Sequence, residues 1–545
     1  MIGNMPEQWD RIVDVAIIGT GGAALTAATM AHDGGSEVLI LEKAPMIGGT
    51  TAVSGGVAWL PLNHHEIDAG IDDSRDEALA YLRTLTAGRE HDPALLEVFV
   101  DTAAEAIRYL EEHTPVRMQL IPNFPDYYFP YPIPGKKGPG RSLEPVPFPV
   151  GTELPEWRDR LATRGALMSL GAATTLGEDF SLQDEALLAE LARREAEDVR
   201  PKGAALVAML FKGLLDRGVD VMVETPAYEL VVVDGTVVGV RCEKDGTDFF
   251  VGTRQGVVLA CGGFEWNEEL VRTYIGYAVQ PLSPGYNEGD GLVMAIGAGA
   301  ELANMQSYWG QPAMFDPEVT RDGKMVPQFE WGRGEPSSII VNQQGQRFAN
   351  EAIPYNDFPK AYGEFNASDS TFPNTPPAWM IFDEKVRQGT RIMSMFPGQP
   401  TPEWVPVAGS IEELADMIGL PVDAVLETVE RFNANAAQGV DPDFDRTKVG
   451  LMGPGRVAPI DTAPYYAVVI HPGALGTNGG PRLTADAQVR AQTGGVVGGL
   501  YAAGNTAASG FGWAYPSGGG TIGQGLVVGF RAGRHIATLP KQQLG

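Results

Sequence analysis

Residues 13–42 read VDVAIIGTGGAALTAATMAHDGGSEVLILE, and this stretch decides the fold. The short, β-branched apolar run at 13–19 predicts a buried parallel strand. The Ala-rich run at 25–35 has helix propensity. A second apolar run at 37–41 predicts the next strand, and Glu42 closes it. Strand, glycine turn, helix and strand within this length predict one βαβ unit.

The glycine turn predicts a dinucleotide site. Gly19 permits the tight turn, Gly21 lets the backbone approach a pyrophosphate, and the helix that begins near Gly22 and Ala23 offers free N–H groups to phosphate. Ala24 takes the place of the third glycine in the GxGxxG pattern. Glu42 follows at about the 20-residue distance at which a carboxylate accepts hydrogen bonds from ribose hydroxyls.

A second glycine-rich segment, KAPMIGGTTAVSGG at 43–56, follows Glu42 directly. A plain NAD fold has no use for it, whereas a flavin cofactor continues past the pyrophosphate toward its ring system. The segment resembles the EKxxxxGGTTxxSGG signature of the fumarate reductase and ketosteroid dehydrogenase flavoproteins. The resemblance implies FAD as cofactor, held by Lys43, Gly48, Gly49, Thr50, Thr51, Ser54, Gly55 and Gly56.

Distant segments add to the same predicted domain. Residues 228–240 predict a hairpin with its turn at 234–235, and 256–263 predict a buried strand that ends in a glycine pair. A similar strand at 499–505 precedes the glycine-rich run 518–523 and a predicted helix at 526–536. The resemblance implies further cofactor contacts from Ala227, Gly262, Gly263, Asp290, Gly504, Asn505, Thr521 and Ile522.

The middle of the chain has a different character. Trp, Phe, Pro and Tyr crowd together from about 308 to 476, with helical patterns at 411–419 and 422–436. We therefore predict an α/β protein with a split Rossmann-like FAD-binding domain, residues 1–313 and 477–545, and an inserted α+β catalytic domain at 314–476 that covers the substrate. A further insertion is predicted at about 132–202.

Bulk composition narrows the function. The 545 residues are 44% apolar and 20% charged, typical of a globular protein with more than one domain. A net charge of −29 argues against nucleic acid and anionic membranes as partners. Cys242 and Cys261 lack CxxC spacing, and His64 and His65 lack HxxxH spacing, so we expect no metal site. We also expect no secretory signal, no integral membrane segment and, by default, a cytoplasmic protein.

Four motifs resemble the bacterial 3-ketosteroid Δ1-dehydrogenase family, and the resemblance covers nearly the whole chain. FPDYY at 124–128 matches that family's FPDYY, and NEAIPY at 350–355 is similar to its NESxPY. LGTNGG at 475–480 is similar to its LGTKGG, and YPSGG at 515–519 to its YPGPG. In the last motif Ser517 and Gly518 replace a Gly-Pro pair, which loosens the loop that carries Gly519.

The resemblance implies a reaction and its residues. Tyr355 would remove the α-proton of a ketone, helped by a hydrogen bond from Tyr127, while the Tyr515 hydroxyl and the Gly519 N–H hold the ketone oxygen. Hydride would pass from the β-carbon to the flavin. The reaction requires such groups. An enolate needs hydrogen-bond donors directed at its oxygen. A tyrosine base has an ordinary pKa of about 10 and needs a neighbouring donor to stabilise its phenolate. The expected substrate is a small apolar ketone, with 1,2-dehydrogenation of a 3-ketosteroid as the first hypothesis.

Several alternatives stay open. Tyr128 or Tyr131 could replace Tyr127 if the register differs. The ketone could be a smaller cyclohexanone, or the double bond could form at the 4(5α) position. Arg387, in FDEKVR, resembles the proton-delivering arginine of soluble fumarate reductases, which would indicate an alkene reductase. A flavin-binding protein without turnover is a further hypothesis, and the electron acceptor is left open.

Overall fold

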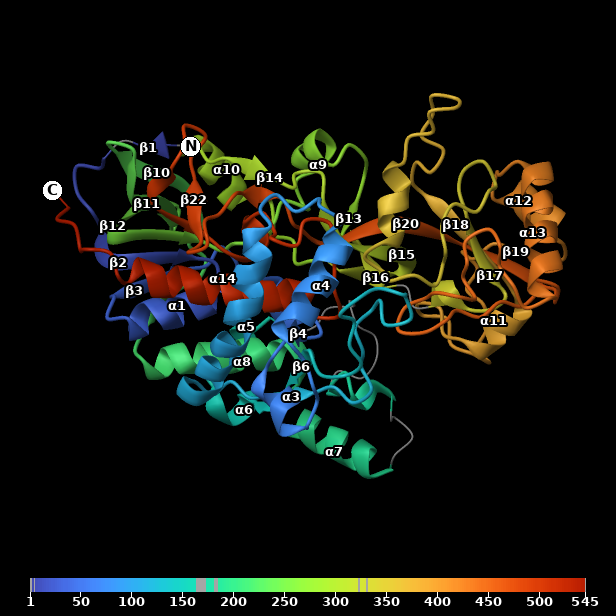
Figure 1. Cartoon of the computed structure of the whole chain (residues 1–545), viewed down its shortest axis with the longest axis horizontal. Helices are drawn as coiled ribbons and strands as arrows, with labels where there is room; N and C mark the ends of the chain where they lie inside the picture. Colours follow the sequence, from blue (N-terminus) through green and yellow to red (C-terminus); the bar gives the residue numbers. More distant parts are fainter. Residues whose placement is uncertain are drawn as a thin grey trace.

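The computed structural model describes residues 2–3, 5–162, 173–180, 185–321, 324–329 and 332–544. Residues 163–172 and 181–184 of the predicted insertion at 132–202 therefore lie outside the described residues. The chain forms two lobes, each built on its own sheet (Figure 1). Both termini lie on the larger lobe, and the middle of the chain forms the smaller one.

Within the described ranges, the larger lobe is built on a nine-stranded sheet. The parallel core runs β23–β12–β2–β3–β9, and the antiparallel hairpin β10–β11 extends it. Strands β2 and β3 are apolar and almost wholly buried, as expected for strands covered on both faces. The members are β1 (Ile2–Gly3), β2 (Arg11–Ile18), β3 (Val38–Leu41), β9 (Asp220–Met222), β10 (Ala227–Val233), β11 (Thr236–Lys244), β12 (Thr247–Leu259), β22 (Gln488–Arg490) and β23 (Val496–Ala502).

The first and last helices join the two ends of the chain. Helices α1 (Gly22–Asp33) and α14 (Gly520–Ile536) lie side by side under the sheet (Figure 1). A Cβ at Gly529 would lie 2.3 Å from the Ala23 carbonyl oxygen, so the two backbones approach too closely for any side chain. The prediction that the last helix starts at 526 was wrong. Glycines lower the helix propensity of its first turn. The close packing that they permit, such as that of Gly523 against the Trp59 backbone, stabilises the helix and offsets this effect.

Most of the remaining elements of the larger lobe lie on the α1 and α14 side of this core, whereas α9 and α10 lie on the opposite side (Figure 1). The described part of the predicted insertion forms short strands and helices around α8, and Lys202 Nζ forms a buried ion pair with Asp179 Oδ2 at 2.7 Å. The elements are α2 (Gly49–Val53), β4 (Ala58–Trp59), α3 (His64–Asp68), α4 (Arg75–Thr86), α5 (Ala94–His113), β5 (Met118–Leu120), β6 (Ser142–Pro145), β7 (Phe148–Pro149), α6 (Val150–Glu153), α7 (Glu185–Ala196), β8 (Val199–Arg200), α8 (Lys202–Asp216), α9 (Glu268–Tyr274) and α10 (Asp290–Gly297).

The smaller lobe has a second sheet, with seven strands among the described residues. Long strands β15 and β20 pair antiparallel, from Tyr308 opposite Thr477, and reach back toward the larger lobe. The sheet comprises β13 (Gln280–Pro281), β15 (Tyr308–Arg321), β16 (Lys324–Phe329), β17 (Ser338–Val341), β18 (Ala378–Asp383), β19 (Val407–Ala408) and β20 (Tyr465–Thr477). A separate pair, β14 (Leu302–Ala303) with β21 (Gly480–Pro481), lies near the junction of the lobes.

Among the described residues, the α-helices of the smaller lobe are α11 (Glu384–Gly389), α12 (Ile411–Met417) and α13 (Val422–Ala436). The apolar faces of α12 and α13 pack with the sheet around Ile381, Leu414 and Phe432, and Val386 of α11 packs in a second cluster with Phe382. The predicted α/β fold class is confirmed. The predicted domain limits at 314 and 476 cut β15 and β20, and that division stays a prediction. Among the described residues, no helix has both the length and the apolar character needed to cross a bilayer.

Candidate active site

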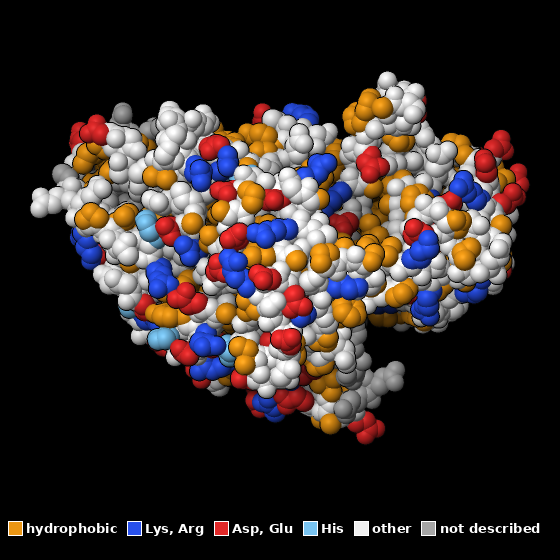
Figure 2. Space-filling model, in the orientation of Figure 1, with side chains coloured by type: hydrophobic (Ala, Val, Ile, Leu, Met, Phe, Trp, Pro, Cys, Tyr) orange, Lys and Arg blue, Asp and Glu red, His pale blue; other side chains and the backbone are white. Residues whose placement is uncertain are grey.

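A cavity of about 1600 Å³ extends from the β2–α1 glycine turn to the predicted catalytic tyrosines. Ligand pockets commonly enclose about 300–1,000 Å³, so this volume has room for more than one bound molecule. Apolar side chains gather on the surface where the two lobes meet (Figure 2). The cavity has a nucleotide end, lined by the glycine turn, and a tyrosine end.

Backbone lines the nucleotide end. Gly19 has φ +107°, and a Cβ there would lie 2.5 Å from the Ala260 carbonyl oxygen, so the turn packs tightly on β12. Gly21 caps α1 without a side-chain hydrogen bond, and the Gly22 N–H donates to Thr51 Oγ1 at 3.1 Å, so the other N–H groups of the first turn face a phosphate site. At the end of β3 the buried Glu42 carboxylate accepts hydrogen bonds from the Thr20 hydroxyl and the Ala44 N–H. Burial raises the pKa of Glu42.

Most of the predicted cofactor residues line this cavity. Gly48 and Gly263 do not. A Cβ at Gly48 would lie 2.6 Å from the Ala52 Cβ, and one at Gly263 would lie 2.2 Å from Thr477 Oγ1, so both glycines serve close packing. The lining residues are Gly19, Gly21, Gly22, Ala23, Glu42, Lys43, Gly49, Thr50, Thr51, Ser54, Gly55, Gly56, Ala227, Gly262, Asp290, Gly504, Asn505, Thr521 and Ile522.

These residues fit the predicted cofactor. A Cβ at Gly49 would have no atom within 4 Å, so the glycine leaves open space beside the backbone. The first turn of α1 suits a pyrophosphate, and the Glu42 carboxylate suits a ribose. The cavity wall also includes Gly519 and Thr521, on either side of Gly520 at the N-terminus of α14. An elongated dinucleotide with a flavin ring matches the order of these groups along the cavity.

Three phenols meet at the other end of the cavity. The Tyr127 hydroxyl donates to the Tyr355 hydroxyl at 3.2 Å, and the Tyr355 hydroxyl lies 3.3 Å from that of Tyr515. All three side chains are buried, and burial raises the pKa of each. Hydrogen bonds from Tyr355, Thr521 and the Gly519 N–H oppose this shift at Tyr515. The four residues predicted as catalytic are therefore brought to one place, and their roles stay predictions.

Hydrogen bonds of main-chain and side-chain groups hold the tyrosine segment and the Gly519 loop in place. Trp59, on β4, donates its backbone N–H to the Gly519 carbonyl at 3.0 Å. Its indole N–H donates to the Asp126 carboxylate at 2.8 Å, and Arg141 donates to the same carboxylate at 2.9 Å. Asp126 directly precedes Tyr127, whose own N–H donates to the Pro516 carbonyl at 3.3 Å. The tyrosine segment and the Gly519 loop are thus fixed to one another.

The neighbouring tyrosines point elsewhere. Tyr128 donates its hydroxyl to Asp357, and its ring contacts Tyr131 at a centroid distance of 5.3 Å. Of these three tyrosines, Tyr127 alone lines the cavity. The structure therefore favours Tyr127, over Tyr128 or Tyr131, as the neighbour of Tyr355.

Arg387 lies outside this site. Its guanidinium is buried and donates to the carbonyl oxygens of Phe396 at 2.9 Å and Gln399 at 2.6 Å, and to Thr401 Oγ1 at 3.0 Å. It does not line the cavity. Its position therefore supports a local structural role and gives no support to the fumarate-reductase hypothesis.

Sequence reasoning missed a buried carboxylate in the cavity wall. Glu265 accepts hydrogen bonds from Ser283 Oγ at 2.5 Å, from Asn287 Nδ2 at 2.8 Å and from the Thr477 N–H at 3.2 Å. Asn287 Nδ2 also donates to Thr50 Oγ1 at 3.0 Å, which connects this group to the predicted flavin loop. The glycine pair at 262–263 was the one local signal, because the partners come from loops far along the chain.

Comparisons with known proteins agree with this geometry. A family model described as FAD binding domain matches residues 14–522. The 4-oxocyclohexanecarboxylate 2-dehydrogenase of Sinomonas cyclohexanicum is 35% identical, over 96% of this chain and 92% of that protein. The 3-oxosteroid 1-dehydrogenase of Mycobacterium tuberculosis is 33% identical, over 96% and 98%. Among solved structures, the 3-ketosteroid delta1-dehydrogenase of Sterolibacterium denitrificans, in complex with 1,4-androstadiene-3,17-dione, gives a TM-score of 0.87 at 31% identity, over 97% of this chain and 99% of that one.

Proposed function

This chain belongs to the FAD binding domain family, with the 3-oxosteroid 1-dehydrogenases among its relatives, and on that premise we propose that it dehydrogenates carbons 1 and 2 of a 3-ketosteroid. The prediction of FAD as cofactor is confirmed, and so is the assignment of the chain to the FAD-dependent oxidoreductases. The substrate, the regiochemistry and the residue roles are our proposal.

One observation carries it: three buried phenols form a hydrogen-bonded row beside the Gly519 N–H, at the far end of the cofactor cavity. An α C–H of a ketone is a very weak acid, so the negative charge that develops on the oxygen must be stabilised. Phenol and amide donors do this without placing a net charge in an apolar pocket.

Each residue has a distinct part in the proposed reaction. Tyr355 takes the α-proton, and the Tyr127 hydroxyl stabilises the phenolate that does so. The Tyr515 hydroxyl and the Gly519 N–H donate to the ketone oxygen. When bound, the flavin of FAD supplies a hydride acceptor for the β-carbon.

The cavity wall supports an apolar ketone over a carboxylate substrate. Among the described lining residues the cations are Lys43 and Arg272. Lys43 is paired with Glu288 and Asp290, and Arg272 is exposed on α9, so neither of these two lining residues is a buried, unpaired cation. The apolar residues of the cavity wall include Phe124, whose ring centroid lies 6.0 Å from that of Tyr127, and Leu176, Phe315, Leu451, Met452 and Leu475.

An anaerobic titration of the holoenzyme tests the proposal. A 3-keto-4-ene steroid should bleach the visible flavin band stoichiometrically, whereas 4-oxocyclohexanecarboxylate should not. The corresponding 3-hydroxysteroid, which lacks the ketone, is the matched control. Bleaching by the carboxylate alone would keep the chemistry and replace the substrate class, and bleaching by neither ketone would contradict the proposed reaction.

Product analysis separates the two ring positions. A saturated 5α-3-ketosteroid can lose hydrogen either at carbons 1 and 2 or at carbons 4 and 5. We expect the 1-ene product, identified by NMR after one turnover. A 4-ene product would assign the chain to the 4(5α) chemistry instead.

A further inference from the structure

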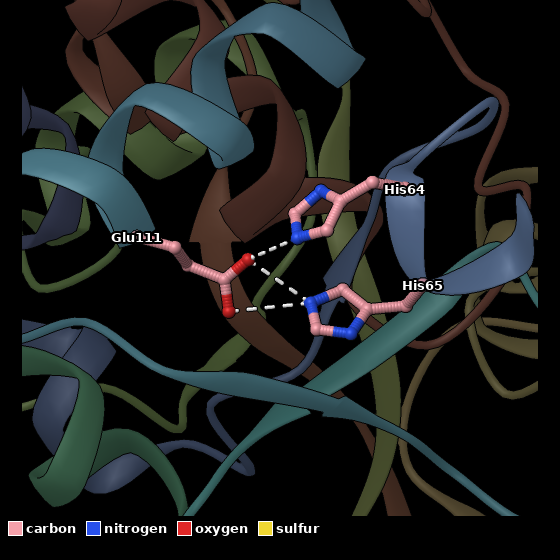
Figure 3. Close-up of side chains that lie close together, drawn as sticks. All are labelled: His64, His65 and Glu111. Carbon is pink, nitrogen blue, oxygen red and sulfur yellow. Dashed lines mark hydrogen bonds and ion pairs between the residues drawn. The ribbon is translucent and has the colours of Figure 1, made fainter. Parts of the chain in front are cut away.

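Away from the cavity, two histidines and one carboxylate converge on the surface of the larger lobe (Figure 3). His64 Nε2 lies 2.8 Å from Glu111 Oε2, and His65 Nε2 lies 3.0 Å from the same oxygen and 3.2 Å from Glu111 Oε1. In the part of the chain that the structure describes, these are the three side chains of metal-ligand type whose donor atoms all lie within 4.8 Å of one another.

Two features hold this arrangement. Consecutive residues of a helix do not ordinarily face each other, yet both imidazoles turn to one carboxylate and their ring centroids are 4.2 Å apart. Helix α3 begins at a buried capping box, in which Asn63 and Glu66 each accept the other's backbone N–H. Glu111 Oε1 also accepts the Met118 N–H at 2.7 Å, which orients the carboxylate. A supporting hydrogen bond of this kind is typical of metal-binding carboxylates.

We propose that His64, His65 and Glu111 bind a divalent transition metal ion of the zinc type. Two imidazole nitrogens and one carboxylate oxygen form a donor set that Zn²⁺ accepts, whereas Mg²⁺ and Ca²⁺ prefer oxygen ligands. Tetrahedral Zn²⁺ bonds of about 2.0–2.2 Å place neighbouring ligand atoms about 3.3–3.6 Å apart. The present separations of 2.8–3.2 Å between each histidine nitrogen and the carboxylate therefore need only small side-chain rotations.

The proposed site links two helices and is open to solvent. Three protein ligands leave at least one coordination position for water, and the histidine side chains are 23% and 22% exposed, so solvent reaches the ion. The ion would join α3 to α5. The sequence predicted no metal site, because the histidine pair lacks HxxxH spacing and Glu111 lies 46 positions from His65.

Calorimetric titration of the untagged holoenzyme with ZnCl₂ tests the site. We expect one saturable Zn²⁺ per chain in the wild type. His64→Ala and Glu111→Gln should each weaken binding at least about 30-fold, because each removes one of three ligands. Glu111→Gln keeps an acceptor for the Met118 N–H, so misfolding does not account for its effect.

His113→Ala is the matched control. His113 also lies on α5, but its ring stacks on Tyr109 and its Nδ1 faces the Tyr109 carbonyl. This variant should bind Zn²⁺ within about twofold of wild type. Absence of saturable binding in the wild type, unchanged affinity in Glu111→Gln, or an equal loss in His113→Ala would each overturn the proposal. Flavin reduction by the steroid reports on the tyrosine end, so failure of either proposal is distinguishable from failure of the other.

Discussion

The two ends of the cavity are built from different material. At the nucleotide end the wall is largely glycine backbone, contributed by two neighbouring stretches around Gly19 and Gly49. At the tyrosine end it is side chains, and the phenols of Tyr127, Tyr355 and Tyr515 come from three segments separated by more than a hundred residues. The first end depends on local backbone conformation, whereas the second depends on how distant segments pack.

This difference predicts that the two ends can be damaged separately. Removal of a phenol leaves the glycine turns and the α1 N-terminus intact, so FAD should remain bound while the chemistry stops. Removal of a nucleotide contact leaves the tyrosine row held by Trp59 and Asp126, so FAD should dissociate more easily while the bound fraction still reacts.

Replacement of Tyr355 should cause the largest loss. Tyr355→Phe removes the proposed base, and a general base is worth about 10²–10⁴-fold in rate. We expect the rate constant for flavin reduction by a 3-keto-4-ene steroid to fall about 10³-fold in stopped-flow measurements, with full FAD occupancy by absorbance. A rate within tenfold of wild type would remove Tyr355 from the base role.

The pH dependence should be the next largest effect. Burial raises the pKa of Tyr355 above its ordinary value, so the reactive phenolate is a minor species at neutral pH. Its fraction rises tenfold per pH unit below that pKa, so the rate of flavin reduction should increase about 100-fold from pH 6 to pH 8 without a plateau. A plateau below pH 8 would indicate that a group with a lower pKa is the base.

Tyr127 and Tyr128 form a matched pair for a third test. Tyr127→Phe removes the donor to the phenolate, and a hydrogen bond to a charged group is worth about 2 kcal/mol, or about 30-fold in rate. Tyr128→Phe removes a hydroxyl bonded to Asp357, away from the cavity, and should change the rate less than about threefold. A larger effect at Tyr128 would show that the register of this segment is other than proposed.

The nucleotide end was the more predictable from sequence for a physical reason. Gly19, Gly21 and Glu42 act within one βαβ unit, so strand periodicity and turn chemistry are enough to bring them together. The limit of local reasoning is visible at α14. Its first turns are poor in helix propensity and become helical through backbone contacts with Trp59 and Ala23, which sequence patterns do not reveal.

The tyrosine end was predictable only through its motifs. No local pattern relates Tyr127 to Tyr355, and composition alone gives no reason to choose them among 16 tyrosines. Glu265 and Asn287 had no motif and were missed, since their hydrogen bonds join loops that meet only in the folded chain. The convergence of His64 and His65 on Glu111 was invisible for the same reason.

The smallest effect should come from Glu42. Its carboxylate is buried at the end of β3, where a bound ribose would donate to it, and loss of one such hydrogen bond costs about 1.5 kcal/mol. Glu42→Ala should therefore raise the dissociation constant of FAD about tenfold in fluorescence titrations. Glu37→Ala, which removes a half-exposed carboxylate just before the same strand, should leave that constant unchanged.

The bound fraction of Glu42→Ala decides whether the two ends are independent. The substitution leaves the Tyr127–Tyr355 contact untouched, so the rate of flavin reduction, measured at saturating FAD, should stay within about twofold of wild type. A large loss of rate at full occupancy would mean that the ribose contact also positions the flavin against the tyrosines. The nucleotide end and the tyrosine end would then depend on each other, because both contact the same bound cofactor.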